Sequence, residues 1–215
     1  MAVLLSVNLA VPQPNRGGKK RGPTGIDKRP ATGAVEVRAP GAHGSGLVGD
    51  GVFDKVNHGG DAQAVYAYAR EDLDRWQAEL GRELTGGMFG ENLTTQGLDV
   101  TGARIGERWR IGADVLLEVT VPRIPCTTFA AWMEEPQWIK RFTEGRAPGS
   151  YLRVVEPGRI RAGDDVSVVS RPEHEVTIGI TFRALTVEPE LLPRLLDIEQ
   201  LPDAVRKKAA RRTTS

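Results

Sequence analysis

The stretch VLLEVTV, residues 115–121, gives the strongest strand signal in the chain, and PRIPCTTF, residues 122–129, follows it directly. Similar apolar, β-branched runs recur at residues 3–9, 34–37, 65–68 and 166–169, mostly bounded by Gly, Pro or Asp. Runs of this kind predict short strands. Because 25 glycines and 14 prolines punctuate them, a mainly β, barrel-like core is favoured over a parallel sheet, which needs a helix between successive strands.

Two helices and a tail are expected around this core. Residues 71–80 have apolar residues at helical spacing and are followed by Gly81, a typical helix end. A shorter helix is expected over residues 137–142, after Pro136. From Pro172 onward, leucines at helical spacing are interrupted by prolines. We therefore expect a barrel domain over residues 1–171 and a small helical appendage over 172–215, docked on the barrel or on a second subunit.

Composition places the chain among ordinary soluble proteins. Its 215 residues are 40% hydrophobic and 27% charged, with a net charge of +1, so neither nucleic acid nor a membrane is an expected partner. The first residues lack the features of a signal peptide, and no apolar run reaches the roughly 18 residues that span a bilayer. We expect a cytoplasmic protein. The single cysteine excludes an internal disulfide and an iron–sulfur cluster held by several cysteines of this chain.

Cys126 is the first candidate for chemistry, because it stands at a rigid strand-to-loop exit, after two prolines and close to Arg123. A thiolate favoured by a guanidinium suits a soft metal or a nucleophilic role. The alternative from position alone is a small, buried and inert side chain, which is the commoner fate of a lone cysteine.

Three further segments carry polar groups that could hold a ligand. His58 precedes Gly59 and Gly60, which permit close approach of a ligand or a positive-φ turn. Asn92 lies in a glycine-bounded loop and could bind a heterocycle or bond its own backbone. Lys28 and Arg29 could grip a phosphate. A solvated turn explains each basic or glycine-rich segment equally simply.

The order of these motifs resembles the MOSC domain, a family named after the C-terminal domain of molybdenum cofactor sulfurase. The resemblance covers about residues 1–170, and the tail is similar to the three-helix appendage of the family's stand-alone bacterial branch. That branch includes reductases of N-hydroxylated bases such as 6-hydroxylaminopurine. The segments that carry it are TGIDKRP, GLVGD, NHGGDAQAV, FGENLTTQGL, IGERWRIG, PRIPCTTF and GSYLRVVEPGRIRAGDDV.

The resemblance implies roles for the candidate residues. Cys126 matches the family's molybdenum ligand and is the expected catalytic centre. The expected contacts of the molybdenum cofactor, a molybdopterin, come from basic residues, the glycine turn and the asparagine loop. They are Lys28, Arg29, His58, Gly59, Gly60, Asn92 and Arg123.

The implied activity is oxygen-atom transfer from a small N-hydroxylated molecule to molybdenum. A separate flavin or iron–sulfur reductase is the expected electron donor, and a homodimer is a further hypothesis. The alternative is a sulfur-transfer or cofactor-carrier protein in which Cys126 holds a persulfide or delivers the cofactor. A sequence departure is Gln63, where related sequences often have lysine.

Overall fold

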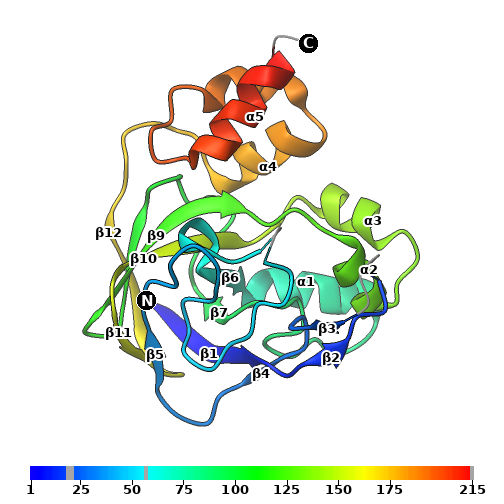
Figure 1. Ribbon diagram of the computed structural model, residues 1–215, viewed down its shortest axis with the longest axis vertical. Coiled ribbons are helices and arrows are strands. Elements are labelled where there is room, and N and C mark those ends of the chain that lie inside the picture. The colour runs from blue at the N-terminus through cyan, green and yellow to red at the C-terminus, as the bar shows by residue number, and fades with distance from the viewer. Residues whose placement is uncertain (18–21, 56–57, 214–215) are drawn as a thin grey trace.

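A closed β-barrel forms the body of the protein (Figure 1). The computed structural model describes residues 1–17, 22–55 and 58–213. In these residues the barrel strands follow one another in the order β12, β8, β9, β10, β6, β7, β1, and pairing of β1 with β12 closes the ring. The barrel strands are β1 (Ala2–Ala10), β6 (Val65–Ala69), β7 (Leu93–Gln96), β8 (Arg108–Ile111), β9 (Val115–Pro122), β10 (Ser150–Glu156) and β12 (Asp165–Ser170).

The expected barrel is confirmed, with one local difference. β6 and β7 pair in parallel, and helix α1 (Arg70–Leu80) makes the crossover between them, as a parallel pair requires. The other barrel pairs are antiparallel. Small strands flank the barrel: β4 pairs with β1, β5 with β11, and β2 with β3. These are β2 (Gln13–Pro14), β3 (Pro23–Thr24), β4 (Lys28–Pro30), β5 (Val35–Val37) and β11 (Gly158–Ile160).

Strand β6 separates two hydrophobic cores. All five of its residues are buried, because alternate side chains point to opposite faces. Val65, Ala67 and Ala69 join the barrel core, while Tyr66 and Tyr68 join an aromatic cluster outside it. That cluster is covered by α1, α2 (Thr127–Met133) and α3 (Trp138–Gly145).

The helices around the aromatic cluster differ in part from those expected from the sequence. α1 ends at Gly81 as expected, since Gly81 has a left-handed backbone (φ 64°) and its N–H donates to the Gln77 carbonyl. α3 is longer than the expected 137–142. Helix α2 was not expected, because the sequence indicated a loop after Cys126; the chain instead turns directly into a helix, whose Phe129 and Met133 are buried in the aromatic cluster.

The tail forms the short helices α4 (Ile178–Thr186), η2 (Pro189–Leu195) and α5 (Asp203–Thr213) at one end of the molecule (Figure 1). The remaining short helix is η1 (Asp61–Gln63). Leu192 and Leu195 are fully buried and continuous with the barrel core. The tail leucines are therefore covered within this chain, and the homodimer stays a prediction. No helix within the described ranges is long and apolar enough to cross a membrane.

The shared core predicts that the tail and the barrel unfold together. Leu192→Ala should lower the free energy of unfolding by about 2–5 kcal/mol, because it leaves a cavity in that core. Half-buried Leu191 provides the matched control, and Leu191→Ala should cost clearly less. Urea unfolding, followed by tryptophan fluorescence and by circular dichroism, measures the free energy of unfolding of both variants. Two separate transitions, with only the smaller one shifted, would contradict a shared core.

Candidate functional site

A cavity beside the barrel collects most of the candidate residues. About 780 Å³ inside it is free of atoms, part of it open to solvent. Its walls come from segments far apart in sequence: the chain leading into β4, the 45–54 loop, the start of β6, and the connection between β9 and α2. Six of the eight candidates line it, namely Lys28, His58, Gly59, Asn92, Arg123 and Cys126.

Strand β9 delivers Arg123 and Cys126 to this cavity. All eight residues of β9 are buried, so the strand is held rigidly up to Pro122. Cys126 has an extended backbone and is the residue before α2, where its carbonyl accepts from the Ala130 N–H at 3.0 Å. The side chain is half-buried at the cavity wall. The thiol is therefore held in a fixed place and is not enclosed in an apolar core.

Arg123 is a buried cation next to that thiol. Its side chain is only 3% exposed, and one guanidinium nitrogen, Nη1, donates to the Phe89 carbonyl. The guanidinium carbon lies 4.0 Å from the centre of the Phe129 ring and 5.3 Å from that of Tyr66, so aromatic faces supply part of its stabilisation. Within the described part of the chain, its Nε has no hydrogen-bond partner.

The surroundings of Cys126 favour the thiolate. Burial raises the pKa of the thiol, but a hydrogen bond with the His58 side chain, the charge of Arg123 and the Phe129 backbone N–H outweigh it. Together they lower the pKa from the ordinary value of a thiol to about 6. At neutral pH the side chain is then mostly a thiolate, the form that binds metals and attacks electrophiles.

The glycine turn brings His58 to the thiol. The His58 backbone N–H donates to the Asp54 carbonyl at 3.0 Å. Gly59 and Gly60 both have positive φ, and a Cβ on either would lie within 2.8 Å of a carbonyl oxygen of the 42–44 segment. Close packing of two backbone segments thus accounts for both glycines. Gly59 lines the cavity and Gly60 does not; Asn57 of the same motif lies outside the described residues.

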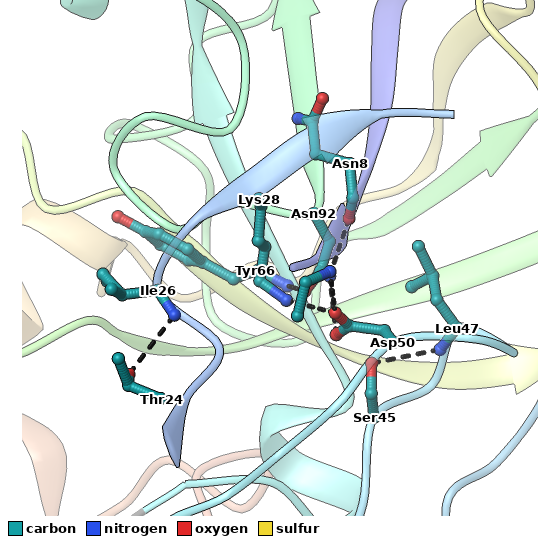
Figure 2. Close-up of polar contacts among 10 residues, drawn as sticks. Asn8, Thr24, Ile26, Lys28, Ser45, Leu47, Asp50, Tyr66 and Asn92 are labelled. Atoms are coloured by element: carbon teal, nitrogen blue, oxygen red, sulfur yellow. Dashed lines mark hydrogen bonds and ion pairs between the residues drawn. The ribbon is translucent and has the colours of Figure 1, made fainter. Parts of the chain in front are cut away.

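A buried ion pair forms another wall (Figure 2). Lys28 Nζ lies 2.5 Å from Asp50 Oδ1, and both side chains are at most 9% exposed. Asp50 also accepts from the Ala10 N–H at 2.8 Å and from Asn92 Nδ2 at 3.0 Å. Burial lowers the pKa of Lys28, opposed by Asp50 and the more distant Glu91. The lysine is thus charge-compensated inside the protein.

Asn92 serves the protein's own backbone. Its Oδ1 accepts from the Tyr66 N–H at 3.1 Å, and its Nδ2 donates to the Asn8 carbonyl as well as to Asp50. The amide therefore ties β1, β6 and the 45–54 loop together. Its expected role as a ligand contact stays a prediction, although the residue does line the cavity.

Arg29 lies apart from this cavity, in contrast to Lys28. Neighbouring residues of a strand point to opposite sides, and on β4 the Arg29 side chain is 65% exposed and bonds Asp27. Asp27 also accepts from Gln13 Nε2 at 3.0 Å. The Asp27 carboxylate, which precedes Lys28, therefore pairs with Arg29 and Gln13 and not with Lys28.

Several cavity residues were missed by sequence analysis. Asp50 and Tyr151 line the cavity, and so does Gln63, which the sequence singled out only as a departure from related sequences. The only local signal for Asp50 was its position between two glycines. Tyr151 lies on β10, and its ring centre is 5.1 Å from that of Tyr66. Gln63 has a buried Oε1 with no hydrogen-bond partner in the described structure.

Comparison with known proteins identifies the family. The family model described as "MOSC domain" matches residues 54–167, more than half of the chain. The chain belongs to the MOSC domain family. This MOSC protein is 35% identical over 180 residues to the uncharacterized protein YflK of Bacillus subtilis, covering 84% of this chain and 79% of YflK.

Two further relatives bear on activity and on fold. A protein named "Reductase" from Gibberella moniliformis is 32% identical over 74% of the MOSC chain, which spans only 28% of that relative's length. The crystal structure of YiiM from Geobacillus stearothermophilus superimposes with a TM-score of 0.79 at 24% identity, covering 99% of both chains. The latter likeness shows that the fold is shared.

The environment of Cys126 predicts the pH dependence of its alkylation. Because a thiolate reacts and a thiol does not, the rate with iodoacetamide should rise with pH to half its plateau near pH 6, as the thiol pKa of about 6 requires. The single cysteine makes the reaction specific. His58→Ala removes the hydrogen bond and should move the midpoint toward that of an ordinary thiol, about 8.5. A wild-type midpoint near 8.5 would contradict the predicted thiolate.

The Lys28–Asp50 pair predicts a large effect on stability. Asp50→Asn leaves Lys28 buried without a counter-charge and should cost about 3–5 kcal/mol. Adding Lys28→Met to that variant should restore part of the loss, because it removes the unpaired cation. Asp203→Asn is the control, since its pair with Arg206 is largely exposed and should contribute less than about 1 kcal/mol. The free energy of unfolding of the wild type and the three variants, measured in urea, tests this. A loss in Asp50→Asn as small as that in Asp203→Asn would exclude a structural role for the pair.

Proposed function

We propose that this MOSC protein binds a molybdenum cofactor through the Cys126 thiolate and reduces N-hydroxylated compounds. The observation that carries the proposal is the position of Cys126 at the wall of a cavity lined by polar and charged side chains, beside the buried cation of Arg123. Soft thiolates are suitable ligands for such metals. The relative named "Reductase" is consistent with redox chemistry.

The other cavity residues fit a polar cofactor with anionic groups. Two buried polar atoms at the cavity, Arg123 Nε and Gln63 Oε1, have no partner in the described residues, and orphaned buried groups are costly unless a ligand or water satisfies them. Lys28 donates one of its three N–H groups to Asp50. Arg123, Gln63 and Lys28 would therefore hold oxygens and nitrogens of the cofactor.

In the part of the chain that the structure describes, no metal site is built from several side chains. Among the described residues no group of three His, Cys, Asp or Glu side chains could hold a metal ion. In our proposal Cys126 supplies the ligand from the protein, and the cofactor supplies the others together with the capacity for oxygen-atom transfer. The chain's own groups keep the thiol ionised and hold the cofactor in place.

The proposed reaction balances as R–NHOH + 2H⁺ + 2e⁻ → R–NH₂ + H₂O. The N–O bond breaks, the nitrogen is reduced, and the oxygen leaves as water. The two electrons would come from a separate flavin or iron–sulfur reductase, since the one cysteine of this chain cannot hold an iron–sulfur cluster of its own.

Molybdenum content tests the proposal directly. The wild type, Cys126→Ser and the control Thr127→Ser would be expressed in a host that makes the cofactor, and metal per chain measured by mass spectrometry. We expect about one molybdenum in the wild type and in the control, in which an exposed neighbour is changed, and a strong loss in Cys126→Ser.

Negligible metal in all three proteins would refute the proposal. A stoichiometric metal content without reduction of N-hydroxylated bases by chemically reduced protein would instead favour the carrier alternative. These two outcomes separate cofactor binding from catalysis.

A further inference from the structure

A second cavity adjoins the one that contains Cys126. About 620 Å³ inside it is free of atoms, part of it open to solvent. Four residues line both cavities, namely Asn15, Thr24, Ile26 and Thr128. Thr128 lies two residues after Cys126 on the same helical start. The two spaces are therefore neighbouring parts of one hollow.

The second cavity lies between the β2–β3 pair and helix α2. Asn15 Oδ1 accepts from the Gly17 N–H at 3.0 Å and lies 3.4 Å from Thr128 Oγ1, which donates to it. A Cβ on Gly17 would lie 2.2 Å from the Thr127 carbonyl oxygen, so the backbone here rests directly on α2. The wall is thus built by tertiary contact and does not depend on a single side chain.

The lining has apolar faces and a polar edge. Ile26, Ala131 and Trp132 supply apolar surface, while Asn15 and the two threonines supply hydrogen-bonding groups. The chain leading past Thr24 and Ile26 continues to Lys28 of the first cavity (Figure 2). Such a lining suits a flat, uncharged heterocycle, because the faces of such a ring are apolar and its edge forms hydrogen bonds.

Charge distribution argues against an anion in this second cavity. Among the described residues of its lining, the charged ones are Arg16 and Glu134, which pair with each other at 3.2 Å, and both side chains are largely exposed. Arg123, whose Nε has no hydrogen-bond partner among the described residues, lines the first cavity instead. An anionic group would therefore be better stabilised beside Arg123 and Lys28.

Trp132 is held as a fixed platform. Its indole N–H donates to the Met88 carbonyl at 2.8 Å, which orients the ring before any ligand binds. It is also the accessible member of the four tryptophans, all of which lie in described residues: Trp76, Trp109 and Trp138 are at most 5% exposed, whereas Trp132 is half-buried.

We propose that the cavity between β2–β3 and α2 binds the heteroaromatic ring of the substrate against Trp132, with the N-hydroxyl group directed toward Cys126. The inference rests on the proposed function and adds where the substrate ring lies and which residue selects it.

Ring binding can be measured on the full-length, metal-free protein. Adenine, the amine product of 6-hydroxylaminopurine, serves as an unreactive probe in calorimetric titrations. Trp132→Ala should raise its Kd about tenfold or more, in line with the loss of a base–aromatic stack, while Trp132→Phe should stay close to the wild type. Ile139→Ala is the control, because Ile139 is a comparably exposed apolar residue on the next helix and should leave the Kd unchanged.

A second measurement does not depend on a variant's folding. Saturating adenine should shield Trp132 of the wild type from acrylamide quenching. Unchanged quenching, or an unchanged Kd in Trp132→Ala, would overturn the inference.

Turnover distinguishes a ring site from a general defect. In the molybdenum-loaded enzyme, Trp132→Ala should raise KM for 6-hydroxylaminopurine but leave kcat/KM for hydroxylamine, which has no ring, near the wild-type value. An equal loss for both substrates would overturn the ring site. Absence of molybdenum from the wild type would refute the proposed function alone, since the adenine titrations of metal-free protein would still decide the location of the ring.

Discussion

The buried guanidinium of Arg123 is the interaction on which the site depends. Arginine stays charged in proteins, and burying an ion costs several kcal/mol unless partners offset it. Here the offset comes from the Phe89 carbonyl, the rings of Phe129 and Tyr66, and the ionised form of Cys126. These partners lie on the 86–91 loop, α2 and β6, so one charge links the three segments around the cavity and favours the thiolate at the same time.

The cavity forms where two cores meet. Val65 and Ala67 of β6 pack inside the barrel, whereas Tyr66 and Tyr68 pack among the aromatic residues under α1, α2 and α3. The hydroxyls of Tyr66 and Tyr68 donate to the Pro148 and Ala147 carbonyls at 2.8 Å. The aromatic cluster thereby fixes both the chain before β10 and the helix that follows Cys126. Precise placement of the thiol is thus a consequence of packing outside the barrel.

Opposite charges are distributed so that the hollow has distinct regions. Lys28 is compensated by Asp50, and Arg123 Nε has no hydrogen-bond partner among the described residues, so this part suits polar and anionic groups. The adjoining space beside Trp132 and Ile26 has apolar faces, and the described charged residues of its lining, Arg16 and Glu134, pair with each other at the surface. This division is the physical basis for assigning a cofactor to the first region and a substrate ring to the second.

Local sequence determined the features that depend on near neighbours. The periodicity of residues 71–80 and the glycine after them predicted α1, the strand runs predicted a mainly β barrel, and motif order predicted the MOSC family. Only the tertiary structure decided that Lys28 faces the cavity and Arg29 does not, that Asn92 is committed to backbone groups, and that Asp50, Gln63 and Tyr151 share the hollow with Cys126. The reason is that these residues belong to segments far apart in the sequence. Their contacts depend on strand pairing and on side-chain packing, which the periodicity of a single segment does not encode.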